Sequence, residues 1–478
     1  MNTPEPAAQL AAVLQPVLGP LIDRFGDAGH ELALVGGPVR DALRGTLDLR
    51  RSTDLDMTTS ARPEQVLELI DGYAEAVWTT GIEFGTVALT HHGFQIEITT
   101  YRADRYDRVS RNPEVVFGES ITDDLARRDF TVNAMAISLI DGAFYDPYGG
   151  IRDLEAGVLR TPSAPEESFA DDPLRIFRLV RFIAQLGFTA DPATAAAAMA
   201  MSGELARITP ERLQGELSRM LLTPRPRPGL EAMVELGIAD VVLPELAALR
   251  MEIDEHHQHK DVYAHSLTVL DQAIDLEPRL GLDGPDLVTR LAALLHDIGK
   301  PPTRRHEDGG GVSFHHHEVV GAKMVRKRLR ALRYSKQVVE DVAQLTFLHL
   351  RFHGFSEGNW TDSAVRRYVT DAGDLLSRLH VLVRSDCTTR NRRRAARLSA
   401  AYDELEARIA DIQAAEDLRA VRPDIDGNEI MRILDVPAGP VVGRAWKHLK
   451  ELRLDRGPLS HDEAVAELKA WAAREGIN

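Results

Sequence analysis

The sequence predicts an α+β fold, in which an N-terminal α/β region precedes an almost wholly helical remainder. A short helix leads into residues 31 to about 150, where strand and helix signals alternate. The expected elements there are a strand over Glu31–Val35, a helix over Pro63–Ile70 and a hairpin over 82–100 that turns at His91-His92-Gly93. From about residue 155 onward the apolar spacing is helical. Proline and glycine breaks interrupt it at residues 224–229, 281–285, 309–311 and 437–440.

Length and composition are those of a multidomain globular protein. A chain of 478 residues, 44% apolar and 27% charged, indicates about three or more domains at roughly 150 residues each. No apolar run is long enough to span a bilayer, and the first residues lack the basic start of a secretory signal. The single cysteine, Cys387, excludes an internal disulfide. We therefore expect a cytoplasmic protein without a membrane partner.

The charge balance is acidic, but basic residues gather in two places. The formal net charge is −16, from 57 basic and 73 acidic residues, which on average disfavours a nucleic-acid partner. The positions of the charges matter more than their sum. The two basic clusters are Lys323, Arg326, Lys327, Arg328, Arg330, Arg333 and Lys336, and Arg390, Arg392, Arg393, Arg394 and Arg397. Each is explained equally well as a nucleic-acid contact or as a solvated helix face.

A pair of carboxylates follows the first predicted strand and its glycine turn. Asp54 and Asp56 are two residues apart in an extended segment, so both side chains point to one face and reach the same divalent cations. Two such ions activate a hydroxyl and stabilise a departing diphosphate. In the turn, Gly36-Gly37 lets backbone amides approach a phosphate, and Arg40 adds positive charge. This order of residues predicts a nucleotidyl transfer site that uses Mg²⁺.

A third acidic residue, Glu97, lies on the predicted hairpin. Ile96 and Ile98 alternate with it, which places both isoleucines in the core and Glu97 on the opposite face. The sequence leaves three alternatives open. Glu97 joins the carboxylate pair, orients it, or is an ordinary solvent-exposed strand residue.

The next motif joins positive charge to a facing polar pair. In Arg127-Arg128-Asp129-Phe130-Thr131-Val132-Asn133-Ala134, Asp129 and Asn133 are i and i+4 and therefore face each other in a helical turn. Arg127 and Arg128 offer guanidinium groups suited to phosphate oxygens. Together with Gly36-Gly37-x-Val39-Arg40-Asp41 and Asp54-x-Asp56, this motif resembles the class II CCA-adding tRNA nucleotidyltransferases of the poly(A) polymerase head-domain superfamily.

This resemblance implies addition of C, C and A to the 3′ end of tRNA from CTP and ATP, without a nucleic-acid template and with release of diphosphate. It assigns the catalytic metal ligands to Asp54 and Asp56. It assigns nucleotide binding to Gly37, Arg40, Arg128, Asp129, Asn133, Asp172, Arg175, Arg178 and Arg181. It also implies a flexible loop over residues 104–118 that takes part in the switch from CTP to ATP.

The resemblance implies that Asp172 and Arg175 choose the base. Asp172 precedes a helix that starts at Pro173, and Arg175 follows it on the same side of the first turn. Cytosine and adenine each present an amino donor beside a ring-nitrogen acceptor, which a carboxylate and a guanidinium complement. Uracil and guanine reverse that order and leave polar groups unpaired. From the residues alone, a capped helix with a local ion pair explains Asp172 equally well, and Glu211-Arg212-Leu213 is interpreted as a structural helix start.

A second set of metal-ligand residues lies in the helical remainder. An apolar helix ends in His296-Asp297, and His265 lies on a preceding helix. Imidazoles and a carboxylate together suit a divalent metal. The pattern resembles the HD phosphohydrolase superfamily. This resemblance implies a second metal site completed by Asp386, with His317 and His349 as additional ligands.

The predicted organisation has four parts. They are a nucleotidyltransferase head over residues 1–155, a helical neck with the base-template helix over 156–248, an HD-like helical domain over 249–400, and a helical tail over 401–478 that contacts tRNA. Three alternatives remain for function. The first is the same chemistry with a different product, as in a poly(A) polymerase or an enzyme that adds only CC or only A. The others are an HD phosphohydrolase whose head merely binds nucleotide, and an RNA-binding module without enzymatic activity.

Overall fold

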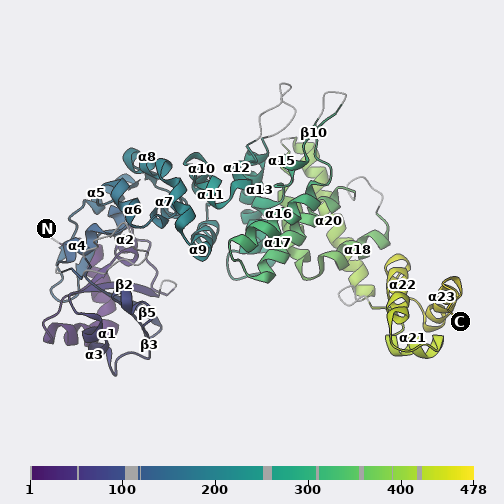
Figure 1. Ribbon diagram of the computed structural model, residues 1–478, viewed down its shortest axis with the longest axis horizontal. Coiled ribbons are helices and arrows are strands. Elements are labelled where there is room, and N and C mark those ends of the chain that lie inside the picture. The colour runs from purple at the N-terminus through teal and green to yellow at the C-terminus, as the bar shows by residue number, and fades with distance from the viewer. Residues whose placement is uncertain are drawn as a thin grey trace. The chain divides into compact units, whose positions relative to one another are not determined.

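The computed structural model divides the chain into two compact units, Met1–Leu243 and Pro244–Asn478 (Figure 1). The described residues are 3–50, 53–102, 117–118, 120–250, 261–307, 312–354, 360–389, 391–416 and 422–477. The expected loop over residues 104–118 lies outside them except for its last two residues, as do Arg390 and the break at 309–311. Among the described residues, no helix is both long and apolar enough to cross a bilayer.

A mixed sheet of seven strands forms the first part of unit 1, in the order β3-β4-β5-β2-β1-β6-β7. The strands are β1 (Leu32–Val35), β2 (Asp54–Thr59), β3 (Ala76–Trp78), β4 (Thr86–His91), β5 (Phe94–Thr100), β6 (Ala136–Ser138) and β7 (Phe144–Tyr145). Only the β2–β5 pair is parallel; every other neighbouring pair in this sheet is antiparallel. The predicted first strand and the hairpin that turns at His92-Gly93 are both confirmed.

Helices cover one face of this sheet. The helices and 3₁₀ turns of this part are α1 (Glu5–Asp27), α2 (Gly37–Leu43), α3 (Pro63–Ile70), η1 (Ile82–Phe84), α4 (Ile121–Ala126) and η2 (Thr131–Asn133). The predicted helix over Pro63–Ile70 is confirmed, and the expected short leading helix is the 23-residue α1. Leu10, Leu14 and Leu18 recur at helical spacing in α1 and are buried with Leu55 and Met57 of the sheet. This core fixes which face of β2 stays free.

The free face of β2 carries the acidic residues because side chains alternate along a strand. Leu55 and Met57 enter the core, so Asp54 and Asp56 point the other way. In the parallel register with β5, Asp56 is paired with Glu97. The three carboxylates therefore share one face of the sheet.

The remainder of unit 1 is mainly helical, as predicted. It contains α5 (Gly150–Ala156), α6 (Pro165–Asp171), α7 (Leu174–Leu186), α8 (Pro192–Ala200), η3 (Ser202–Arg207), α9 (Pro210–Leu221), α10 (Arg227–Glu235) and α11 (Ile238–Val242), with the short parallel pair β8 (Val158–Leu159) and β9 (Thr189–Ala190). Helix α7 packs against α9 and α10. At its start, the Asp172 carboxylate accepts from the Leu174 N–H over 3.2 Å, while the N-cap position falls on Pro173, one residue later than expected.

Unit 2 is also mainly helical. Its elements begin with α12 (Pro244–Ala247), α13 (Val262–Leu276), η4 (Glu277–Leu280), α14 (Leu287–Leu295), α15 (Lys300–Thr303), the pair β10 (Arg305–His306) and β11 (Val312–Ser313), α16 (His317–Ala331) and α17 (Lys336–Leu348). They continue with η5 (His349–Gly354), α18 (Asp362–Ala372), η6 (Gly373–Leu375), α19 (Leu376–Ser385), α20 (Arg392–Ala415), α21 (Gly427–Leu434), α22 (Pro440–Arg456) and α23 (His461–Arg474). Helix α20 runs through residue 400, where the sequence suggested a border, and α21–α23 enclose a small core of their own.

Candidate active site and histidine cluster

Asp54 and Asp56 lie at the start of β2, on its free face. Desolvation raises the pKa of Asp56 above its ordinary value. The nearby Asp54 charge raises it further, and the guanidinium groups of Arg128 and Arg178 oppose the rise. Two like charges on one strand face beside arginines are suited to a divalent cation and an anionic ligand.

The glycine turn approaches these carboxylates closely. Gly36 has φ +73°, a left-handed conformation that favours glycine, and a Cβ added there would lie 3.2 Å from Arg128 Nη1 and 3.6 Å from Asp56 Oδ2. Arg128 Nη2 contacts Asp124 over 3.4 Å, while Nε is buried and has no hydrogen-bond partner among the described residues. Gly36, Arg128 and Asp56 thus lie close together, and Arg128 Nε is a donor suited to a ligand.

Glu97 belongs to the same electrostatic site. Its pKa is raised by burial and then by the charges of Asp56 and Asp54, which lie beside it on β2. Glu97 is solvent-exposed on the same sheet face as Asp56. The three alternatives of binding a metal, orienting the aspartates and being an exposed strand residue therefore stay open.

Behind the turn, the predicted polar residues form a buried chain of hydrogen bonds. Arg40 Nη1 donates to Asn133 Oδ1 over 2.6 Å, and Asn133 Nδ2 donates to Asp129 Oδ1 over 2.9 Å. Arg178 Nε donates to Asp129 Oδ2 over 2.7 Å. The predicted facing pair Asp129 and Asn133 is therefore confirmed as a contact. Arg40 also forms a two-pronged ion pair with Asp41, so its guanidinium is engaged within the protein.

The chain of contacts keeps Asp129 ionised. Burial alone would raise the pKa of Asp129, but the Arg178 guanidinium and hydrogen bonds from Asn133 and the Phe130 N–H hold that pKa well below its ordinary value. Arg181 makes its hydrogen bonds to other residues. It donates to Glu216 and Gln185 and lies over the Phe182 ring at 3.8 Å.

A cavity of about 220 Å³ adjoins this network. Its lining is almost entirely charged and consists of Arg127, Arg128, Asp129, Asp172, Leu174, Arg175, Arg178 and Arg212. The cavity unites the head motif around residue 128 with the first turn of α7, although these segments are more than forty residues apart in sequence. Its guanidinium groups suit a phosphate-bearing ligand.

Within this cavity, the residues predicted to choose the base do not pair with each other. Arg175 donates to Ser168 Oγ over 2.8 Å and to the carbonyl of Arg127, so the suggested local ion pair with Asp172 is wrong. Asp172 is held instead by Arg212, whose Nη2 lies 3.0 and 3.3 Å from the two carboxylate oxygens. Arg212 was interpreted as part of a structural helix start. No local spacing signals its contact with Asp172, forty residues away.

In unit 2, all six residues of the predicted second site converge. They form two groups, and within each group the ligand atoms lie within 4.8 Å of one another. One group is His265, His296 and Asp386, and the other is Asp297, His317 and His349. Asp297 links the groups. Its Oδ2 lies 3.2 Å from His296 Nε2, and its Oδ1 lies 3.3 Å from His317 Nε2.

The histidine cluster, defined as these six residues, has the features of a metal site. Nδ1 of His296, His317 and His349 each faces a backbone carbonyl three residues earlier, at 2.9, 2.8 and 2.6 Å. These contacts fix the proton on Nδ1 and turn the Nε2 lone pair inward. All three Nε2 atoms are buried and make no hydrogen bond of good geometry among the described residues, although those of His296 and His317 lie 3.2 and 3.3 Å from Asp297 oxygens. Buried imidazole nitrogens that converge on carboxylate oxygens form a donor set that fits divalent cations.

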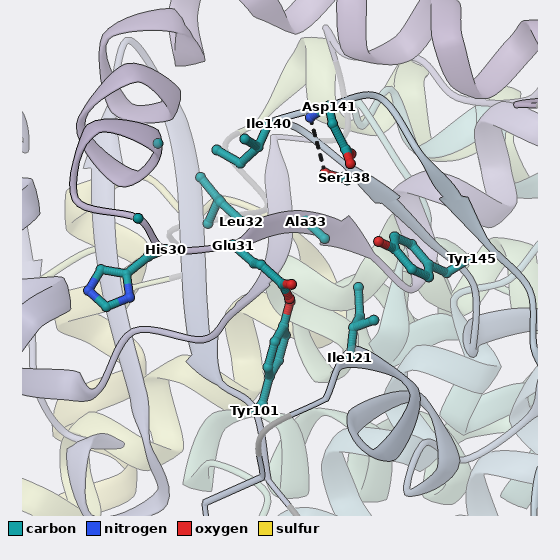
Figure 2. Close-up of a pocket in the computed structure, with 12 residues that line it drawn as sticks. His30, Glu31, Leu32, Ala33, Tyr101, Ile121, Ser138, Ile140, Asp141 and Tyr145 are labelled. Atoms are coloured by element: carbon teal, nitrogen blue, oxygen red, sulfur yellow. Dashed lines mark hydrogen bonds between the residues drawn. The ribbon is translucent and has the colours of Figure 1, made fainter.

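A second cavity in the head, of about 260 Å³, lies at the opposite end of β1 from the glycine turn (Figure 2). In it, Tyr101 donates to Glu31 Oε2 over 2.7 Å, and the Asp141 N–H donates to Ser138 Oγ over 3.3 Å. Its lining includes none of the residues predicted for the site. The cavity is therefore separate from the carboxylate site.

Three arginines of the first basic cluster form ion pairs. Arg326 and Arg330 both pair with Glu340, and Arg328 pairs with Glu245. The solvated, ion-paired helix face is thus the better interpretation of this cluster. In the second cluster, Arg392, Arg393, Arg394 and Arg397 are exposed on the first turns of α20.

Three known families match successive parts of the chain. The poly A polymerase head domain matches residues 32–160, a family described as the probable RNA and SrmB-binding site of polymerase A matches 187–249, and the HD domain matches 262–412. Fold and site thus define the class of nucleotidyltransferases that carry a poly(A) polymerase head and an HD domain.

Curated relatives narrow this class. The A-adding tRNA nucleotidyltransferase of Deinococcus radiodurans is 33% identical over 452 residues, which cover 92% of this chain and 95% of that protein. The CCA-adding enzyme of Lacticaseibacillus paracasei is 37% identical over 249 residues, 52% of this chain and 60% of that protein. The chain belongs to the tRNA nucleotidyltransferase family.

Solved structures share the fold over nearly the whole chain. The Bacillus stearothermophilus CCA-adding enzyme in complex with CTP superimposes with a TM-score of 0.67 at 24% identity, covering 97% of this chain and 98% of that one. The Thermotoga maritima CCA-adding enzyme complexed with tRNA gives 0.59 at 20% identity, covering 95% and 94%. The predicted α+β architecture of sheet-containing head and helical remainder is therefore confirmed.

Proposed function

We propose that this chain adds C, C and A to the 3′ end of tRNA, taking CTP and ATP and releasing diphosphate. One observation supports the proposal most strongly. Arg128 lies beside the Gly36 turn and also lines the arginine-rich cavity, so it connects the carboxylate face of β2 to that cavity. A nucleoside triphosphate needs both parts, a site for metal and phosphate and a site for the base. Named relatives with CTP, ATP or tRNA support the substrate class.

Asp54 and Asp56 would hold Mg²⁺, with Glu97 as a third carboxylate beside them. Bound Mg²⁺ supplies charge stabilisation to the attacking hydroxyl and the departing diphosphate. The protein itself positions the triphosphate. Gly36 and Gly37 allow the backbone to approach phosphate, and Arg128 and Arg178 neutralise its charge. Arg40 and Asn133 act indirectly, because Arg40 holds Asn133 and Asn133 holds Asp129 through hydrogen bonds. Arg181 holds Glu216, which lies beside Arg178.

Asp172 and Arg175 are proposed to select the base at the edge of the cavity. Arg212 leaves the Asp172 carboxylate able to accept from an exocyclic amine, because a carboxylate has about four acceptor positions. Arg175 reaches the ring nitrogen only if its guanidinium exchanges a protein contact, to Ser168 or to the Arg127 carbonyl, for the ligand. Base choice thus involves a movement of this side chain.

The full-length relative in Deinococcus radiodurans favours one second candidate, addition of A alone. A single experiment separates the two. Purified protein is incubated with tRNA transcripts that end before CCA, after C and after CC, each with CTP or ATP alone and with both. CCA addition predicts C incorporation into the first two transcripts. Incorporation of A into the third transcript alone, with none of C, would replace the proposal by A addition.

The histidine cluster is proposed to bind divalent metal and to carry a separate phosphohydrolase activity. The buried Nε2 atoms of His296, His317 and His349, which converge on the Asp297 carboxylate, support metal binding. Lys300 Nζ lies 2.6 Å from Asp297 Oδ2 and brings a positive charge suited to phosphate to the edge of the cluster. Phosphate release that survives Asp54→Ala but not Asp297→Asn would assign the hydrolase to this cluster. Loss of release in Asp54→Ala alone would assign it to the head.

The three predicted domain borders and the tRNA contact of the tail remain proposals. The compact core of α21–α23 supports treating residues after 422 as a separate folding element. A tRNA substrate agrees with the cytoplasmic location predicted from the sequence.

A further inference from the structure

One row of paired residues crosses four neighbouring strands of the head sheet. Asp56 on β2 pairs with Glu97 on β5, Glu97 pairs with Ala88 on β4, and Ala88 pairs with Trp78 on β3. Directly paired residues lie on the same face of a sheet. Trp78 therefore shares the face of the carboxylates. At about 4.8 Å between strands, its strand lies roughly 14 Å from that of Asp56.

Trp78 is conspicuous on this face. Its side chain is 48% exposed on the edge strand, although tryptophan is normally well buried. The residue between Trp78 and Glu97 is Ala88, whose small side chain adds little bulk between the indole and the carboxylates. The row from Trp78 through Ala88 to Glu97 is called the path below. Phe84, just before β4, is also exposed, at 47%. An exposed aromatic ring on the same sheet face as a candidate catalytic site is suited to a ligand with flat faces.

The same face carries a positive charge beside the path. Thr86 lies two residues from Ala88 on β4, so both point to the same side. The Thr86 hydroxyl contacts Thr99 of β5 over 3.0 Å and accepts from Arg102 Nη2 over 2.9 Å. The Arg102 guanidinium therefore lies on the path side of the sheet, where it is suited to backbone phosphates.

The chemistry of transfer fixes the side from which the acceptor must come. In an in-line displacement, the attacking hydroxyl and the departing diphosphate lie on opposite sides of the reacting phosphorus. The phosphate-binding turn at Gly36 follows β1, which is on one side of β2. The hydroxyl therefore approaches from the other side, across β5 and β4. That side is the row of Glu97, Ala88 and Trp78.

We propose that Trp78 is a stacking platform for a base in the single-stranded 3′ end of the RNA acceptor, which crosses Ala88 to place its terminal hydroxyl beside Glu97 and Asp56. This inference rests on the proposed function, since it assumes an RNA acceptor. A stacked strand rises about 3.4 Å per nucleotide, so the 14 Å path corresponds to at most about four nucleotides. Stacking on an aromatic face is independent of sequence, which suits an acceptor end whose last base changes with each addition.

The test compares Trp78→Ala and Trp78→Phe with Val77→Ala. Val77 is 43% exposed on the same strand but pairs with the buried Leu89, so it points to the other face and is a matched control. Two measurements use a tRNA transcript that lacks CCA. They are the KM for this RNA and for CTP in nucleotide incorporation, and the Kd for the fluorescently labelled RNA without nucleotide. Thermal unfolding midpoints verify that all variants fold.

Trp78→Ala is expected to raise KM and Kd for the RNA about tenfold, the loss of one base–aromatic stack, while KM for CTP stays within about twofold. Trp78→Phe should recover most of the RNA affinity, and Val77→Ala should resemble wild type. Equal RNA affinity in Trp78→Ala and Val77→Ala would overturn the inference. A wild-type protein that incorporates no nucleotide but loses RNA affinity in Trp78→Ala would instead refute the proposed function and leave the stacking platform standing.

Discussion

The Arg212 guanidinium contacts both carboxylate oxygens of Asp172, over 3.0 and 3.3 Å, at the edge of the charged cavity. The Leu174 N–H donates to the same carboxylate. These contacts restrict rotation of the carboxylate. Under the proposed role of Asp172 in base choice, Arg212 acts as a positioning residue.

Arg212→Ala should lower the selectivity for CTP over UTP about tenfold. A carboxylate that rotates freely can also pair with the wrong base, so the cost of unpaired polar groups no longer excludes UTP. The ratio of kcat/KM values for the two nucleotides measures this effect. Arg207→Ala is the control, since Arg207 forms an exposed ion pair with Glu204 and does not line the cavity. An unchanged selectivity with a reduced rate would show that Arg212 supports α7 only.

Gly36→Ala should raise KM for CTP by about tenfold or more, because the added Cβ displaces Arg128 from the phosphate turn. Gly93→Ala is a matched control. Gly93 has φ +80° but nothing within 4 Å of an added Cβ, so it shares the backbone strain without the crowding. Both variants should lose about 1–2 kcal/mol of unfolding free energy. Similar KM values in the two variants would refute the phosphate role of the turn.

Asp54→Ala should reduce nucleotide incorporation at least about a thousandfold, since the site then lacks a ligand for the metal that stabilises developing charge. Incorporation of radiolabelled CTP into tRNA measures the loss, and Asp297→Asn is the control in the other unit. Incorporation that persists in Asp54→Ala at ordinary metal concentration would place the chemistry elsewhere.

The sequence predicted what depends on local spacing. Asp54 and Asp56 share a face because a strand has a period of two, and the Ile96-Glu97-Ile98 alternation predicted that Glu97 points away from the core. The parallel pairing of β2 with β5, which brings Glu97 beside Asp56, was not predicted. The six residues of the histidine cluster were all named because resemblance supplies the pattern and apolar helices supply the frame.

The sequence did not predict which partner a long side chain chooses. The i, i+3 spacing suggested a pair between Asp172 and Arg175, but Ser168 on the preceding helix and the Arg127 carbonyl from the head bind Arg175 instead. Asp172 then pairs with Arg212 of α9. Such choices depend on how α6, α7 and α9 pack, and no local period encodes that packing.

Asp129→Asn should destabilise the protein by about 2 kcal/mol at pH 7, since it removes a charged partner of Arg178. The pKa of Asp129 is lower in the folded state than in the unfolded chain. Its stabilising contribution is therefore fully present above about pH 4 and is lost as the pH falls further, toward the folded pKa. Urea unfolding at pH 7, 4.5 and 3 tests this. The difference from wild type should be equal at the first two values and smaller at the third; a difference that already shrinks between pH 7 and 4.5 would contradict it.

The two groups of the histidine cluster predict a metal stoichiometry. Asp297 faces His296 with one oxygen and His317 with the other, so it can serve a metal in each group. Wild type should bind two divalent ions in this unit at saturating metal. The double variant His317→Ala/His349→Ala should retain one, because His265, His296 and Asp386 remain. Elemental analysis after dialysis, in an Asp54→Ala background that removes the head site, counts the ions.

Nucleotide incorporation, measured without that background, should be unchanged in the double variant, since the cluster is separate from the carboxylates of β2. Loss of all bound metal in the double variant would mean a single shared ion, held jointly by both groups.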